Sequence, residues 1–322
     1  MKGLLDRILR WGLLLAVLGG CGITTSSPAP EDSSPGGWTT LAPMPTARQE
    51  VAVAEAGGKV YVIGGFGEAF EASDVVEAYD PVAKRWEGRA PLPAPLHHPA
   101  AASVGGKIYV MGGYSGRVSW TASDALFEYD PATNAWRERA SMPTARGGLV
   151  AVALGGRIHA LGGAAERPVS AHEVYDPATD RWSRANPMPT ARDHLAATAL
   201  GGKVYVIGGR ASFLGEQYGS LEIYDPSTDS WRTGQPLPLP RGGLAAAAAA
   251  GRVLVFGGEL SFRIVEAVEA YDPAADRWTA RAPMPTPRHG MGAAVVGGQV
   301  YLPAGATRPG PGRTDVLEAF TP

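Results

Sequence analysis

The feature that most restricts the fold of this chain is a set of short motifs that recurs six times. Glycine pairs follow apolar alternating runs, and neighbouring copies lie 46 to 50 residues apart. A fixed period of this length is typical of repeat proteins, in which each unit buries its faces against its neighbours. The copies are Gly64-Gly65, Gly112-Gly113, Gly162-Gly163, Gly208-Gly209, Gly257-Gly258 and a degraded Ala304-Gly305.

Two further series of motifs agree with the glycine pairs in phase and in number. Each repeat contains a Tyr-Asp-Pro triplet, which is degraded to Phe-Thr-Pro in the last copy. A series of six tryptophans recurs with the same period. Agreement of three series excludes coincidence. The triplets begin at Tyr79, Tyr129, Tyr175, Tyr224, Tyr271 and Phe320, and the tryptophans are Trp38, Trp86, Trp136, Trp182, Trp231 and Trp278.

Each repeat has the turn residues of a four-stranded antiparallel sheet. In the first repeat, Gly57-Gly58 can form a two-residue hairpin turn. Asp80-Pro81 opens a second turn, because proline presets φ and aspartate bonds nearby amides. The residues between these turns are typical strand formers. We predict strands over 51–54, 59–63 and 75–79 and a fourth that starts at Trp86.

An apolar run into Gly-Gly, followed by Tyr-Asp-Pro and Trp, resembles the kelch repeat, and the resemblance covers about residues 38–322. It implies an all-β, six-bladed β-propeller of the kelch type with four-stranded blades. The last repeat ends at Pro322 without a tryptophan strand, whereas an unpaired one, 38–42, precedes the first repeat. We therefore expect the N-terminal strand to pair with the last blade and close the ring. The repeat phase also places 245–250 on a strand, against the helical preference of alanine.

The N-terminal residues are typical of an export signal. Lys2, Arg7 and Arg10 precede an apolar stretch of about ten residues, which is too short to span a bilayer. The stretch ends in Leu-Gly-Gly-Cys, which resembles a bacterial lipobox with Cys21 as the lipidated residue. We predict a lipoprotein signal peptide over 1–21, a flexible Ser/Pro-rich tether over 22–37 and the propeller over 38–322. An ordinary signal peptide with an incidental cysteine is the alternative.

These segments predict a cell-envelope protein that is anchored to the membrane by lipid on Cys21. The chain has no acidic residue directly after Cys21, which by analogy with enterobacterial sorting favours the outer membrane. The net charge of -2 does not suggest a nucleic-acid partner. Since Cys21 is the single cysteine, an intrachain disulfide and a cysteine zinc site are excluded. We expect a monomer.

Alternating strand direction places two kinds of connection on one face of the propeller, and these connections carry the variable residues. The loops between the second and third strands are rich in aromatics and arginines, a combination typical of binding surfaces. Some of these aromatics could instead cap the core. The aromatic candidates are Tyr114, Trp120, Phe213, Tyr218 and Phe262.

The connections between blades place arginines at one equivalent position, where they could form an anion-binding rim or a structural tie between neighbours. These residues are Arg48, Arg146, Arg192, Arg241 and Arg288; the second blade has Leu96 there. The next two positions differ between blades and include Glu50, His97, His98, Asp193, His194 and His289. Imidazole beside carboxylate can serve acid–base catalysis or metal binding, whereas a solvated polar rim is the simpler interpretation. We assign no metal and no cofactor.

Function stays open at this level, because kelch propellers include enzymes, adaptors and adhesins. We favour a binding module over an enzyme, namely a cell-envelope lipoprotein whose propeller face binds a protein or a glycan. The alternative is a sugar-acting enzyme that resembles periplasmic sialic-acid epimerases (mutarotases). This resemblance implies catalytic roles for Glu50, assisted by arginines such as Arg48, Arg192 and Arg288, and His98 and His194 are further candidates. A copper radical oxidase is excluded because it needs a cysteine crosslinked to tyrosine. A purely architectural envelope role is a third possibility.

Overall fold

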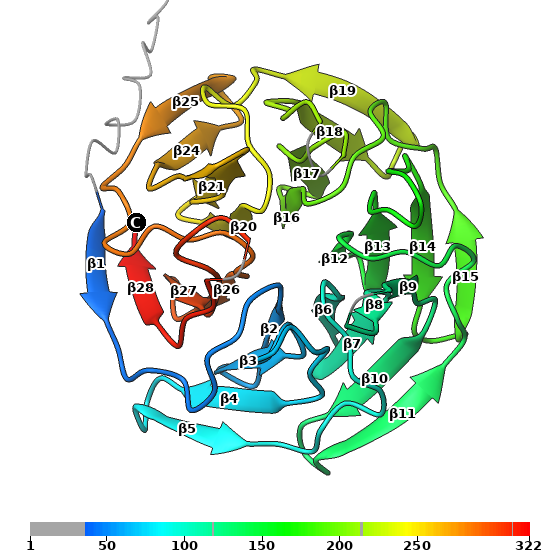
Figure 1. Ribbon diagram of the computed structural model, residues 1–322. Coiled ribbons are helices and arrows are strands. Elements are labelled where there is room, and N and C mark those ends of the chain that lie inside the picture. Colours follow the sequence, from blue (N-terminus) through cyan, green and yellow to red (C-terminus); the bar gives the residue numbers. More distant parts are fainter. Residues whose placement is uncertain (1–35, 118, 213–214, 311) are drawn as a thin grey trace, which may run out of the picture. The chain divides into compact units, whose positions relative to one another are not determined.

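The computed structural model describes residues 36–322 except 118, 213–214 and 311. In this region the chain forms six four-stranded antiparallel sheets, arranged as the blades of a β-propeller around a central axis (Figure 1). The predicted fold class is therefore confirmed. The signal peptide, Cys21, nearly all of the tether and Phe213 lie outside the described residues. Within the described part of the chain, no helix has the length and apolar character that crossing a bilayer requires.

The strands follow the same order in every repeat, from the axis outwards. The innermost strands are β2 (Ala52–Ala56), β6 (Ala100–Val104), β12 (Val150–Leu154), β16 (Ala196–Leu200), β20 (Ala245–Ala249) and β26 (Ala294–Val296). The second strands are β3 (Lys59–Ile63), β7 (Lys107–Met111), β13 (Arg157–Leu161), β17 (Lys203–Ile207), β21 (Arg252–Phe256) and β27 (Gln299–Pro303).

The third strands are β4 (Val76–Asp80), β10 (Leu126–Asp130), β14 (His172–Asp176), β18 (Leu221–Asp225), β24 (Val268–Asp272) and β28 (Leu317–Thr321). The outermost strands are β5 (Arg85–Gly88), β11 (Ala135–Arg139), β15 (Arg181–Arg184), β19 (Ser230–Gly234), β25 (Arg277–Ala280) and β1 (Gly37–Thr40). Two short hairpins, β8 (Tyr114–Ser115) with β9 (Thr121–Ala122) and β22 (Glu259–Leu260) with β23 (Arg263–Ile264), extend the loops of blades 2 and 5.

The ring closes as the sequence predicts. Strand β1 pairs antiparallel with β28, and Trp38 lies opposite Phe320, so the sixth blade contains both ends of the propeller. This pairing removes an exposed sheet edge and joins the first and last repeats. The alanine run forms the innermost strand β20, as its phase indicates, with Ala245 paired to Phe256. Small side chains fit there because the innermost strands crowd around the axis.

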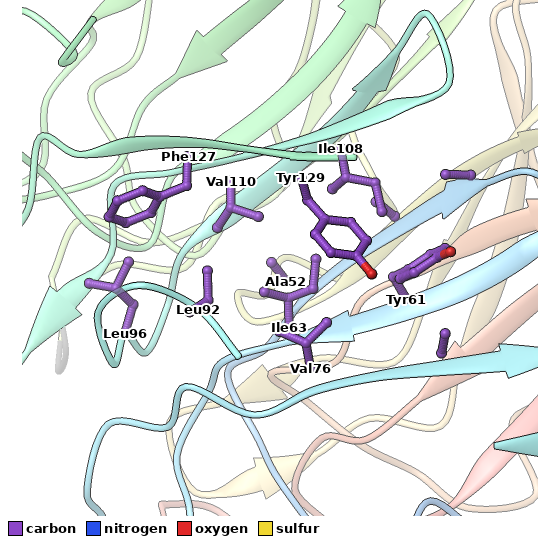
Figure 2. Close-up of a cluster of buried hydrophobic side chains, with 13 residues drawn as sticks. Ala52, Tyr61, Ile63, Val76, Leu92, Leu96, Ile108, Val110, Phe127 and Tyr129 are labelled. Atoms are coloured by element: carbon purple, nitrogen blue, oxygen red, sulfur yellow. The ribbon is translucent and has the colours of Figure 1, made fainter. Parts of the chain in front are cut away.

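The core lies between the blades. Figure 2 shows one such layer, in which Tyr61, Ile63 and Val76 of blade 1 face Val110 and Tyr129 of blade 2. The six tryptophans strengthen these contacts, since each indole N–H donates to a backbone carbonyl of the preceding blade at 2.7–2.9 Å. The acceptors, beginning with that of Trp38, are Ala282, Ala42, Ala90, Ala140, Asn186 and Gln235.

Candidate functional site

A closed ring of backbone hydrogen bonds surrounds the propeller axis at the loops that enter the innermost strands. The amide of each ring residue donates to the carbonyl of the equivalent residue in the preceding blade, over 2.7–3.0 Å, and the sixth bond returns to the first residue. All six residues have φ between 50° and 63°. We call this set the axial ring; it consists of Glu50, His98, Gly148, His194, Gly243 and Gly290.

Three blades meet the demand for positive φ with glycine, but the other three place Glu50, His98 and His194 there. Positive φ is uncommon for residues other than glycine and is a strained conformation that clusters at functional sites. The glycines also leave space for these side chains. A Cβ added to Gly290 would lie 2.3 Å from Glu50 Oε1, and one added to Gly148 would lie 3.2 Å from His194 Nδ1.

The ring side chains form the floor of a pocket of about 360 Å³ at the mouth of the propeller, which we call the mouth pocket. On the other side of the ring, an axial cavity of about 180 Å³ continues between the innermost strands, and all six ring residues line it. The mouth pocket is lined by Gln49, Glu50, Phe66, Phe70, His98, Trp120, His194, Arg210, Gln217, Glu259, Ser261, Phe262, His289, Pro309 and Gly310.

The imidazole and carboxylate groups predicted to be neighbours do converge here. His98 Nε2 lies 3.4 Å from Glu50 Oε2, and His289 Nε2 lies 3.7 Å from Glu50 Oε1. His194 reaches the same point from blade 4, with its ring 4.9 Å from that of His98. His97 Nδ1 lies 2.7 Å from His98 Nδ1 and orients that ring. Chain order alone thus located this cluster correctly.

A second polar network supports His194. Its Nδ1 hydrogen-bonds Asp193 Oδ1 at 2.6 Å. Arg210 donates to Asp193 at 3.0 Å and to Glu259 at 2.9 Å, and its Nη2 lies 2.9 Å from His194 Nε2. Glu259 Oε2 in turn lies 3.6 Å from His289 Nε2. One guanidinium therefore holds residues of blades 4 and 5 in a fixed arrangement around the floor.

Burial and neighbouring charges shift the pKa values of His97, His98 and Asp193 at the floor. Burial, followed by the charges of His194, His97 and Arg210, holds the pKa of His98 well below its usual value, so this imidazole is neutral near pH 7. Burial lowers the pKa of His97 to about 3. Burial acts to raise the pKa of Asp193, but the hydrogen bonds and charges of His194 and Arg210 outweigh it and keep the carboxylate ionised.

Aromatic side chains form the wall of the mouth pocket. Phe66 is buried and stacks on His97 with ring centroids 3.9 Å apart, so it belongs partly to the cap of the core. Trp120 lies 5.3 Å from His98 and is 50% exposed, while Phe70 and Phe262 are 36% and 82% exposed. The wall thus offers apolar ring faces to a molecule on the polar floor.

Some predicted site residues have other positions. The five equivalent arginines do not form a rim, because each is fully buried within its blade. Each guanidinium pairs at 2.5–2.9 Å with a glutamate of the third strand, namely Glu77, Glu173, Glu222, Glu269 or Glu318. In blade 2, where Leu96 replaces the arginine, Glu128 pairs with Lys107 and Arg139 instead. The anion-binding rim and the catalytic part considered for Arg192 are therefore wrong: the arginines are structural.

Two of the loop aromatics also differ from the prediction. Tyr114 is buried, and its hydroxyl donates to the carbonyl of Ala164 at 2.7 Å, so it supports His97 from behind. Burial raises its pKa to about 12. Tyr218 does not line the mouth pocket; its backbone bonds Gly209 and Arg241. Trp120 and Phe262 lie where the sequence places them.

From the sequence, Arg210 is grouped only with the other arginines of these loops, and Glu259 and Gln217 are not identified as site residues. A signal for the first two was present, since each directly follows a glycine pair. The residue after each pair forms a bridge to the residue that precedes the axial ring, as in Asp193 with Arg210 and Gly242 with Glu259. This position varies between blades as much as the ring does, and that variation was the available signal. Gln217 had no comparable signal.

Comparison with known proteins places the chain among propellers. Residues 36–188 and 184–305 match the family model of the KLHDC2/KLHL20/DRC7 Kelch-repeats domain. Kelch-like protein 21 of Danio rerio is 43% identical over 49 residues, which are 15% of this chain and 8% of that protein. An F-box/kelch-repeat protein of Arabidopsis thaliana is 38% identical over 80 residues, 23% of this chain and 21% of that protein. The chain therefore spans a small part of these relatives.

A solved structure extends the likeness to nearly the whole propeller. The structure of YjhT superposes with a TM-score of 0.76 at 18% sequence identity, and the alignment covers 86% of this chain and 95% of that one. At this level of identity the similarity establishes the shared fold.

Proposed function

The chain belongs to the kelch-repeat family, and from this scaffold and its mouth pocket we propose that the protein is a glycan-binding module that accepts one sugar unit in the pocket. The observation that carries the proposal is the convergence of a polar floor and an aromatic wall in one cavity of about 360 Å³. This size lies within the range of roughly 300–1,000 Å³ that is typical of small-molecule sites.

The floor and the wall match the two kinds of surface on a sugar ring. Hydroxyl groups both donate and accept hydrogen bonds, and the pocket offers carboxylate oxygens of Glu50 and Glu259 beside the side-chain amide of Gln217. The C–H face of a sugar packs on an aromatic ring, and Trp120 and Phe262 present exposed ring faces at the rim. Such rigid, amphipathic anchors bind with little loss of conformational entropy.

The charge of the pocket selects among sugars. Three carboxylates, Glu50, Asp193 and Glu259, surround one guanidinium, that of Arg210, which already pairs with two of them. The buried arginines are committed to glutamates within the blades. We therefore propose a neutral or amino sugar as ligand rather than a sugar acid, which would meet repulsion from the floor.

A thermal-shift screen of residues 34–322 against neutral sugars, amino sugars and sugar acids tests this function. A ligand that binds only the folded state raises the melting temperature by mass action. We expect a shift with a neutral or amino sugar, a smaller shift in a Trp120→Ala, Phe262→Ala variant, and a full shift in Val82→Ala, which alters an exposed residue at an outer turn. Absence of a melting-temperature shift with every sugar would contradict this function.

Catalysis on the bound sugar is the second candidate function. It is favoured by the 3.4 Å contact between the carboxyl group of Glu50 and the imidazole of His98, which places two groups capable of proton exchange beside one substrate. A Glu50→Gln variant that retains sugar binding but loses turnover, followed by NMR of the anomeric or ring protons, would support it. Equal turnover in the parent protein and in Glu50→Gln would exclude Glu50 as the acid or base.

We also propose that this module is lipid-anchored in the cell envelope through Cys21, because the chain before the propeller has the charge, length and terminal motif of a lipoprotein signal. Cys21→Ala should leave the protein unprocessed or release it from the membrane fraction. Unchanged fractionation with the membrane, with retained processing, would disprove the anchor.

A further inference from the structure

The three side chains of the axial ring have more specific chemistry than sugar binding requires. Glu50, His98 and His194 come from blades 1, 2 and 4 and project to the axis from positions that are strained for these residue types. One carboxylate oxygen and two imidazole nitrogens, one from each residue, lie within 4.8 Å of one another. Two imidazoles and a carboxylate are also the protein ligands of many three-ligand zinc sites.

The observed distance between two of these donors is that of ligands on one ion. Ligands about 2.0–2.1 Å from a tetrahedral zinc ion lie roughly 3.3–3.4 Å apart. His98 Nε2 and Glu50 Oε2 are separated by 3.4 Å, which is long for a hydrogen bond between a buried imidazole and a carboxylate.

Neighbouring side chains already hold Nδ1 of both imidazoles, which leaves Nε2 of each ring as the donor for an ion. Asp193 accepts from His194 Nδ1 at 2.6 Å, and the Nδ1 atoms of His98 and His97 are 2.7 Å apart. In metalloproteins a ligating histidine almost always donates its other N–H to a carboxylate or another acceptor.

The local charge suits a dication. Three carboxyl groups, those of Glu50, Asp193 and Glu259, lie around the floor with a single guanidinium, that of Arg210. Two of the glycines in the ring provide the space for the donors, because a Cβ at Gly290 or Gly148 would crowd Glu50 or His194.

We propose that Glu50, His98 and His194 form a binding site for a divalent transition-metal ion of the zinc class on the propeller axis, with an open position toward the mouth pocket. This revises the expectation, drawn from the sequence, that the protein has no metal site. The proposal does not depend on the identity of the sugar or on sugar binding at all.

Arg210 contacts one of the proposed donor atoms, because its Nη2 lies 2.9 Å from the His194 Nε2 that would bind the ion. The guanidinium and the ion compete for this nitrogen. Binding therefore requires Arg210 to withdraw from His194 while its contacts with Asp193 and Glu259 remain available. Removing the positive charge of Arg210 should strengthen metal binding. The affinity of a metal site elsewhere on the protein would not change.

The test is isothermal titration of metal-free protein, residues 34–322, with Zn²⁺ and with Mg²⁺, together with visible absorption of the Co²⁺ form. We expect one Zn²⁺ per chain, no comparable binding of Mg²⁺, and intense tetrahedral Co²⁺ bands. Glu50→Gln, which preserves shape, should weaken Zn²⁺ binding at least ten-fold, because even the loss of an outer-shell partner costs roughly 10–100-fold. Arg210→Gln should bind Zn²⁺ more tightly.

Glu259→Gln is the matched control, since it removes a carboxylate from the same pocket outside the donor set and should weaken Zn²⁺ binding by less than Glu50→Gln does. His159→Gln tests the other close histidine pair, His159 and His172, and should leave binding unchanged. Melting curves in chelator establish that each variant is folded. Absence of Zn²⁺ binding in the parent, or equal affinity in the parent and a folded Glu50→Gln, overturns the site.

Discussion

Two layers of residues in the same interblade connections differ in what they do. The five equivalent arginines point into the blades and pair with buried glutamates, and the pattern is the same wherever the arginine occurs. Two residues further on, the axial ring has one backbone conformation in all six blades, but its residues differ. Three are glycines, and the others are Glu50, His98 and His194. Five of the six blades agree in the first layer, whereas the blades diverge in the second.

This difference shows that the recurring arginines and the varied residues of the axial ring have separate physical causes. The arginine layer satisfies backbone carbonyls and the buried carboxylate of its blade, so the same residue recurs in five blades. In blade 2, Lys107 and Arg139 pair with the corresponding Glu128 instead. The axial ring needs only positive φ, which glycine supplies without strain. Side chains other than glycine there cost stability and must be explained by what they do at the axis.

The largest expected effect comes from breaking the arginine layer. Arg288 donates to the carbonyls of Leu302, Ala304 and Val316 and to Glu318, which is 1% exposed. Arg288→Met leaves this carboxylate buried without its partner and should lower the free energy of unfolding by about 3–5 kcal/mol. Urea unfolding measures this loss.

Arg85→Met is the matched control, because Arg85 pairs with Glu87 while its side chain is 68% exposed. An exposed pair contributes about 0–1 kcal/mol. If Arg288→Met costs no more than Arg85→Met, the arginine layer is not structural and the contrast with the axial ring fails.

The stability of the protein at low pH should depend on a buried histidine pair within blade 3, His159 and His172, as well as on the histidines at the mouth. Burial, with the neighbouring imidazole, lowers the pKa of His159 to about 4, and burial lowers that of His172 to about 4. The unfolded values are about 6.5, so the unfolded chain takes up protons first as pH falls. The stability of the neutral pair is therefore complete above about pH 6.5 and is lost as pH falls toward 4.

Between pH 7 and 5.5 this pair should account for a loss on the order of 2–3 kcal/mol, since each histidine contributes at most about 1.4 kcal/mol per pH unit. Urea unfolding of the parent and of His159→Gln, His172→Gln at both pH values measures the difference. The variant should lose less stability on acidification. An equal loss would show that the mouth histidines alone cause the acid sensitivity.

The smallest effect has the opposite sign. Glu50→Gly replaces a strained residue with φ of 54° by the residue that three other blades use there. It should raise the free energy of unfolding by about 1 kcal/mol while it weakens Zn²⁺ binding. Gly243→Ala is the converse, because its Cβ would enter positive φ at 3.2 Å from His289 Cβ. It should destabilise by a similar amount. Destabilisation by Glu50→Gly would mean that Glu50 is a structural residue.

Most of the fold could be predicted from the sequence, because three motif series specified blade number, strand phase and ring closure. The alanine run at β20 illustrates this, since phase outweighed intrinsic propensity. The site was predicted in part: chain order brought Glu50, His98 and His289 together, and the strand order brought His194 to the same end. The burial of the arginines could not be predicted from the sequence. An arginine at this position can point to the rim or into its own blade, and the sequence position is the same in both cases.

The sequence by itself determined the number of blades, the closure by the first strand and the loops that meet at the mouth, because repeat spacing and strand alternation restrict these features along the chain. Only the tertiary structure decided which side chains reach the axis. That choice depends on φ at the axial ring, on the space left by Gly148 and Gly290, and on the pairing of Arg210 with Asp193 and Glu259. Apart from the pair of Arg210 and Asp193 within blade 4, these are contacts between neighbouring blades, and local sequence patterns carry no direct record of them.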